Sequence, residues 1–157
     1  MNQGFYLFFL LALLAEIIGT ISGFGSSILF VPLATIFIDF KLVLGITAVF
    51  HVFSNLSKIV LFKKGINKEI AFKLGIPAVL FVILGAYLTQ VIPLKEIELS
   101  MNLIILGLTL FLISGAGRKI QQTNFNLYTG GVISGFLAGL IGTGGAIRGI
   151  TLAAFGL

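Results

Sequence analysis

The sequence predicts an all-α protein, a polytopic bundle of transmembrane helices with an internal repeat and with discontinuous helices broken at glycines. Three observations lead to this fold class. Of the 157 residues, 58% are hydrophobic and 10% are charged, against roughly 25% charged in a typical soluble domain. Apolar stretches recur at the length that crosses a bilayer, about 20 helical residues. Two of these stretches contain a glycine-rich interruption, near residues 23–27 and 142–145.

The composition also excludes several function classes. The chain has no cysteine, which excludes disulfide scaffolds and thiolate metal sites. One histidine and five carboxylates leave little for another kind of metal centre, so we expect no metal and no cofactor. The net charge of +5 comes from basic residues at a few points between apolar runs. This distribution is a topology signal rather than a nucleic-acid-binding surface.

Apolar segments divide the chain into membrane spans. The first, 5–38, is too long for one straight span, so we expect it to cross, to unwind at 23–27 and to continue as a half-helix over 28–38. Its beginning lacks the basic region of a secretory signal, and we interpret it as a retained helix. Further spans are expected at 42–62, 70–92, 97–116 and from about residue 127.

Basic residues orient these spans in the cell membrane. Lysines cluster around the turn at 63–69, and Arg118 and Lys119 lie in the turn two spans later. The positive-inside rule then predicts that 63–69 and 117–124 are cytoplasmic. The N-terminus is also cytoplasmic if 5–38 crosses once, and external if the half-helix crosses fully. The sequence leaves both topologies open.

An internal repeat relates the two glycine-rich interruptions. Shifted by 119 residues, GFGSSILFVPLA (23–34) aligns with GTGGAIRGITLA (142–153), and five of the 23 positions from 16 to 38 are identical. The pattern is stronger than the identity: an apolar helix with small residues four apart, a break, then a short apolar helix. We therefore expect a first repeat over 1–119 and the start of a second, truncated repeat over 120–157.

This division implies that partner helices of the second repeat lie outside the chain. We expect them to cover the small-residue stripe of Gly131, Gly135 and Gly139 and to shield Arg148. The alternative is a homodimer that closes the pathway. If the chain is a fragment, it should bind and transport nothing by itself.

A helix break inside a membrane predicts a binding site. Unwound backbone is tolerated there where it is buried in protein or lines a wet cavity. The helix that restarts beyond the break offers free N–H groups and the positive end of its dipole to an anion. The candidate site residues are therefore Gly23, Gly25, Ser26 and Ser27 at the first break, and Gly142, Thr143, Gly144, Gly145 and Arg148 at the second. The alternative is that these glycines only allow tight helix packing.

A polar stripe on segment 42–62 adds further candidates. Its members follow i, i+4, i+7, i+8, i+11 spacing and share one helix face; they are Thr47, His51, Ser54, Asn55 and Lys58. Polar side chains in a membrane helix face the bundle interior or a wet path. We assign His51 and Asn55 to the anion site, with His51 able to carry a proton. The alternatives are interhelical hydrogen bonds for these two and, for Lys58, snorkelling to the cytoplasmic interface.

Two other ionisable residues fall inside apolar segments. Glu16 lies within the first span, and Arg148 follows the second break by one turn. Neither should face lipid, because a charge at the bilayer centre costs about 2.5–3.5 kcal/mol on insertion scales. We expect Arg148 either to complete the anion pocket or to pair with Glu16.

These motifs resemble the sulfite exporter TauE/SafE family of membrane permeases. The resemblance is carried by GFGSSILFVP (23–32), KIVLFKKGINKEIAFKLGIPAVLFVILGAYL (58–88) and GFLAGLIGTGGAIRG (135–149). Two departures stand out: Ser26 and Ser27 lie where glycines are usual, and Thr151 replaces the proline of the second copy. The resemblance implies transport of small anions, with sulfite and sulfur-containing organic acids as examples.

The sequence therefore favours a non-enzymatic secondary permease for a small, sulfur-containing anion. Its expected partners are that anion, the bilayer and a coupling ion such as the proton, and no nucleic acid. Two other classes stay open. One is an ion-coupled cation carrier with Glu16 as ligand. The other, an intramembrane hydrolase using Ser26 or Ser27 with His51 as base, is disfavoured because the second break has no serine at the matching positions.

Overall fold

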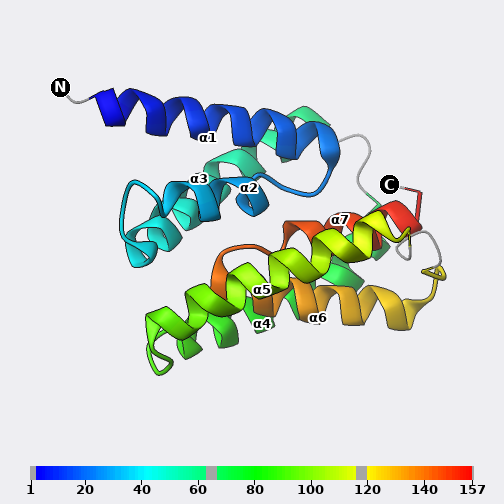
Figure 1. The fold of residues 1–157 in the computed structure, drawn as a ribbon. Helices are drawn as coiled ribbons and strands as arrows, with labels where there is room; N and C mark the ends of the chain where they lie inside the picture. Colours follow the sequence, from blue (N-terminus) through cyan, green and yellow to red (C-terminus); the bar gives the residue numbers. More distant parts are fainter. Residues whose placement is uncertain (1–2, 63–66, 116–119, 157) are drawn as a thin grey trace.

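Seven α-helices and no strand make up the described part of the computed structural model, residues 3–62, 67–115 and 120–156. In chain order the helices are α1 (Gln3–Ser22), α2 (Ser27–Ala34), α3 (Phe40–Phe62), α4 (Lys68–Leu88), α5 (Leu94–Ile113), α6 (Asn124–Ile141) and α7 (Gly145–Ala154). Figure 1 shows α1, α2 and α3 as one group and α4 to α7 as another, with the long helices running side by side within each. The all-α prediction is confirmed.

Two helices in the described ranges are long and apolar enough to cross a membrane. These stretches are Phe40–Leu61 of α3 and Lys68–Leu88 of α4, and two shorter apolar helices are Tyr6–Ser22 and Gly145–Ala154. The long helices also expose large apolar side chains, such as Phe53 on α3. Extensive exposed apolar surface is unfavourable in water and marks a contact with lipid or with other protein.

Local sequence explains where α4 and α6 begin. The side chain of Asn67 accepts a hydrogen bond from the Ile70 N–H at 3.2 Å, and Thr123 does the same for the Asn126 N–H at 3.2 Å. Such caps satisfy N–H groups that have no partner inside the helix. They fix the starts of both helices two to three residues ahead of the predicted spans.

The half-helix predicted over 28–38 is shorter in the structure. α2 ends at Ala34, and residues 35–37 form turns. There the Thr35 hydroxyl donates to the Pro32 carbonyl at 2.7 Å, and the N–H groups of the following residues bond back three or four positions. This tightening ends the helix and redirects the chain into α3. α4 likewise ends at Leu88 rather than 92, because a turn precedes Pro93.

Glycines allow α4 and α6 to pack with their backbones in contact. In each of three contacts a glycine of α6 lies against a backbone carbonyl of α4: Gly131 with Leu74, Gly135 with Ala78 and Gly139 with Val82. A β-carbon on any of these glycines would overlap the facing oxygen. We expected helices outside the chain to cover this stripe, and that was wrong. The stripe is covered by α4, whose small and apolar side chains let α6 approach.

The core of the molecule surrounds α2. Buried apolar side chains of α1, α2, α3, α5 and α6 form one cluster, in which Val31 and Ala34 are fully buried. α2 contacts α1, α3 and α7. Its eight residues contain no charged side chain, so half of them are buried without leaving a buried charge unpaired. This position holds the start of α2 next to the start of α7.

Candidate functional site

The chain leaves the helical conformation between α1 and α2. Gly23 has a φ of +75° and Gly25 a φ of +84°, left-handed conformations that glycine adopts without steric cost. The Gly25 N–H donates to the Gly19 carbonyl at 3.2 Å, which closes the end of α1. Ser26 precedes α2 and makes no side-chain capping hydrogen bond. The first N–H groups of α2 are therefore not satisfied by the residue that normally caps them.

The connection between α6 and α7 matches the first connection in part. α6 ends at Ile141, and Gly142 has a φ of +74°, close to that of Gly23, whereas Gly144 has a φ of −116° where Gly25 is left-handed. At a displacement of 119 residues, the last residue of α1 coincides with the last residue of α6, and the starts of α2 and α7 differ by one residue. Gly144 precedes α7, so no side chain caps that helix either.

The two connections contact each other. Gly25 lies against Gly145, and a β-carbon on Gly145 would overlap the Phe24 carbonyl oxygen. In the same way Gly149 lies against the Gly23 carbonyl oxygen. Such close approach of two backbones requires the absence of side chains. The N-termini of α2 and α7 are brought together by it.

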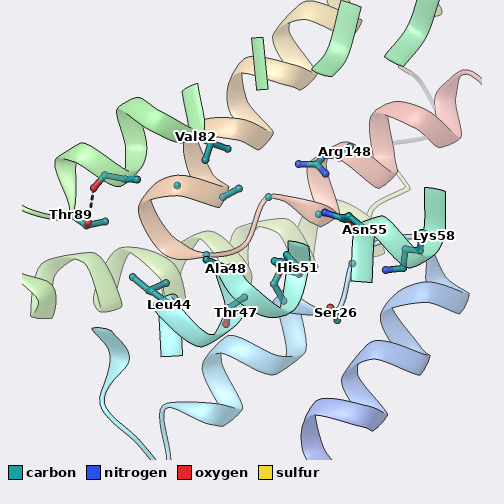
Figure 2. A pocket seen from close by; sticks show the side chains of 18 residues that line it. Ser26, Leu44, Thr47, Ala48, His51, Asn55, Lys58, Val82, Thr89 and Arg148 are labelled. Atoms are coloured by element: carbon teal, nitrogen blue, oxygen red, sulfur yellow. Dashed lines mark hydrogen bonds between the residues drawn. The ribbon is translucent and has the colours of Figure 1, made fainter. Parts of the chain in front are cut away.

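A cavity of about 470 Å³ opens at this junction. Figure 2 shows it bordered by α3 and α4 as well as by the two connections. Nine of the eleven predicted site residues line it: Gly25, Ser26, Ser27, His51, Asn55, Gly142, Gly144, Gly145 and Arg148. Two do not. Gly23 is packed against Gly149, and Thr143 is buried away from the cavity with 1% of its surface exposed.

The polar stripe of α3 faces this cavity. Thr47 and Lys58 line it together with His51 and Asn55, and Figure 2 shows these side chains on α3 opposite Arg148 of α7. Ser54, the remaining member, points toward α1 instead and donates to Glu16. Four of the five stripe residues therefore line the same cavity.

α4 supplies cavity residues that sequence reasoning missed. Val82 and Ala86 of α4, and Thr89 directly after its end, also line the cavity. The Thr89 hydroxyl donates to the Ala86 carbonyl at 2.7 Å, the dashed line in Figure 2. No polar stripe marks this face of α4, so only the packing of α4 on α6 reveals it.

Some polar side-chain atoms at the cavity are buried and have no hydrogen-bond partner. Among them are the Arg148 Nε and the Thr47 hydroxyl oxygen. Leaving a buried polar group unsatisfied costs about 1–3 kcal/mol, and more for a charged group. Such groups in native proteins usually have a role or bind a ligand or water. Both groups are available to a ligand that accepts hydrogen bonds.

Lys58 forms an ion pair with Glu16 of α1. Its Nζ lies 2.6 Å from the Glu16 Oε1, and the Ser54 hydroxyl donates to the same oxygen at 2.5 Å. Of the two alternatives expected for Arg148, the structure shows a position in the cavity lining, because Glu16 pairs with Lys58. The pairing was not predicted because the two residues are 42 positions apart and share no motif.

Comparison with known proteins assigns the chain to a family. A family model described as sulfite exporter TauE/SafE matches residues 8–157. The chain belongs to the TauE/SafE family. This match confirms the resemblance seen in the sequence motifs. TauE/SafE is a family of membrane transporters. No curated protein and no solved structure gives a significant match to the TauE/SafE chain.

Proposed function

We propose that this chain is a multi-pass permease of the cell membrane that binds a small, sulfur-containing anion where α2 and α7 begin. One observation carries the proposal: two uncapped helix N-termini meet at a cavity that also holds the unpartnered Arg148 Nε. A helix N-terminus presents N–H donors and the positive end of the dipole. An anion in this cavity would gain both dipoles and a charge-assisted hydrogen bond from the guanidinium.

Neutral groups complete the proposed anion site. Thr47 offers a free hydroxyl, and Asn55 offers an amide N–H from the same face of α3. We assign Ser26, Ser27, Gly144 and Gly145 to the N–H and hydroxyl donors at the helix starts, with Gly25 and Gly142 making room for the ligand. Gly23 and Thr143, outside the lining, are assigned to positioning the two breaks.

His51 is the group that we assign to ion coupling. It lines the cavity, and an imidazole can accept or release a proton in the physiological range. Transport would then be secondary, with the anion and a proton moving together or in exchange. An anion and a proton bound in one cavity would also lower the charge that has to cross the membrane.

An internal repeat with discontinuous helices explains why the break occurs twice. The helix bounds agree at a displacement of 119 residues, and Gly23 and Gly142 have nearly equal φ values. These agreements support a first repeat over 1–119 and the start of a second over 120–157. In transporters built from repeats, the substrate site lies at the repeat interface near the middle of the bilayer.

Binding and transport make different demands on the chain. The described residues already bring two helix N-termini, Arg148 and the polar residues of α3 to one cavity, so we propose that the chain by itself binds the anion, in contrast to the sequence-based expectation. For transport we propose that further helices or a homodimer close the pathway. The proposed cytoplasmic turns are 63–69 and 117–124; their residues 63–66 and 117–119 lie outside the described residues.

The geometry disfavours a cation carrier built on Glu16. The Lys58 ammonium already pairs with the Glu16 carboxylate, so a cation bound there would be repelled by Lys58 or would have to displace it. A hydrolase using Ser26 or Ser27 with His51 would differ in class from the transporters of the family that the chain matches.

Vesicles that contain the purified protein test the proposed substrate class. Binding and uptake of sulfite, sulfate, methanesulfonate and acetate are compared at equal concentration. We expect one or more of the sulfur oxyanions to bind more tightly than acetate. Equal weak binding of all four anions, or Na⁺ uptake that depends on Glu16, would overturn the anion proposal.

A further inference from the structure

Lys58 belongs to two structural features at once. Its side chain lines the cavity beside Asn55, and its ammonium group is paired with the Glu16 carboxylate at 2.6 Å. Glu16 itself is not part of the cavity lining. The Glu16 carboxylate therefore lies outside the cavity lining. It affects the electrostatic potential in the cavity by offsetting the charge of Lys58.

The ion pair sets the charge that a ligand meets. Among the described residues, Lys58 and Arg148 are the groups with a permanent positive charge that line the cavity. Glu16 offsets one of these charges through its contact with Lys58. With a neutral His51, the balance at the cavity is one positive charge instead of two.

We propose that Glu16 is a specificity-determining residue that tunes the cavity for a singly charged anion. This assignment rests on the anion-binding function proposed above. With Glu16 in place, a monoanion neutralises the site, and a dianion leaves an uncompensated negative charge in a low-dielectric space. Without the carboxylate, Lys58 becomes a free cation at the wall and a dianion becomes the better match.

The hydrogen bonds around Glu16 support this role. The Ser54 hydroxyl, the Thr20 hydroxyl and the Lys58 ammonium all contact Oε1, whereas Oε2 is buried with no partner. Three donors on one oxygen hold the carboxylate in one orientation, next to the charge of Lys58.

Two tetrahedral sulfur oxyanions of different charge test the proposal. Binding of radiolabelled sulfate and methanesulfonate to the protein in vesicles is measured at pH 8, where an ordinary imidazole is neutral. For Glu16→Gln we expect the affinity for sulfate relative to methanesulfonate to rise about tenfold, equivalent to about 1.4 kcal/mol. Glu69→Gln is the matched control, because it breaks another lysine–glutamate pair on α4, and Lys73 does not line the cavity.

The double variant Glu16→Gln/Lys58→Gln separates charge from structure. It returns the cavity to one permanent positive charge, so the sulfate-to-methanesulfonate ratio should return close to that of the unmodified protein. If Glu16→Gln does not yield folded protein by gel filtration, Lys58→Gln provides the test, and its ratio should fall.

The outcomes distinguish this proposal from the one on which it rests. If the unmodified protein binds methanesulfonate and the ratio does not move in Glu16→Gln or Lys58→Gln, Glu16 has no role in selecting charge. If the unmodified protein binds none of sulfite, sulfate and methanesulfonate, the anion-binding function itself fails.

Discussion

Gly135 on α6 lies so close to Ala78 on α4 that a β-carbon at residue 135 would overlap the Ala78 carbonyl oxygen. Gly135 is buried, and the contacts of Gly131 and Gly139 with α4 repeat the same geometry one turn to either side. α4 and α6 therefore approach as closely as two backbones can. The cavity depends on this contact, because α4 and α6 both contribute to its wall.

Replacing Gly135 by alanine should destabilise the fold. The new methyl group must push α4 away from α6, and overpacking of this kind costs about 1–3 kcal/mol. Thermal unfolding in detergent should show a lower midpoint for Gly135→Ala. Gly107→Ala on α5 is the control, because no atom lies near its new methyl group, and its midpoint should stay equal or rise. Equal midpoints for the two variants would contradict the close packing of α4 on α6.

Gly23→Ala isolates the cost of the left-handed conformation at the first break. Nothing lies within 4 Å of a β-carbon at Gly23, whose φ is +75°. The destabilisation, about 1–2 kcal/mol, should therefore come from backbone strain alone. Gly45→Ala in α3 also adds a methyl group in open space, and there it should stabilise by about 0.5–1 kcal/mol. Thermal unfolding of both variants checks the opposite signs; a gain in both would mean that the break is not held in this conformation.

Removal of His51 should weaken anion binding and transport. His51 lines the cavity, and the loss of one hydrogen-bond donor to a charged ligand is worth about 1.5–3 kcal/mol, tenfold or more in affinity. Ser100→Ala is the comparison, because Ser100 lies on α5 and donates to the Glu96 carbonyl at 2.7 Å, away from the cavity. Equal affinity and uptake for His51→Ala and Ser100→Ala would reduce the stripe on α3 to helix packing.

The sequence predicts local features of this protein well because they depend on short-range chemistry. Apolar length predicts α3, α4 and α5 to within a few residues, and glycine content locates the connections at 23–26 and 142–144. Helical periodicity brings His51, Asn55 and Lys58 to one face, and all three line the cavity.

The features missed by the sequence arise from contacts between distant segments. The Lys58–Glu16 pair joins α3 to α1. A lysine or a glutamate in a sequence does not indicate which oppositely charged residue it will contact in the fold. The cavity wall supplied by Val82 and Ala86 carries no polar signal. The glycine stripe of α6 indicates a close neighbour but not its identity, which is decided by the fit of α4 to α6.

Arg148 provides the most direct test of the anion cavity. Arg148 lines the cavity with its Nε buried and unpartnered, so an anion in the cavity would supply the hydrogen-bond partner that this charged group lacks. The measurement is the affinity of radiolabelled sulfite for the protein in vesicles, compared among the unmodified protein, Arg148→Gln and the distant control Lys73→Gln. We predict saturable binding that Arg148→Gln weakens at least tenfold, about 1.4 kcal/mol, and that Lys73→Gln leaves unchanged. Equal sulfite affinity in Arg148→Gln and the unmodified protein would contradict an anion site at the junction of α2 and α7.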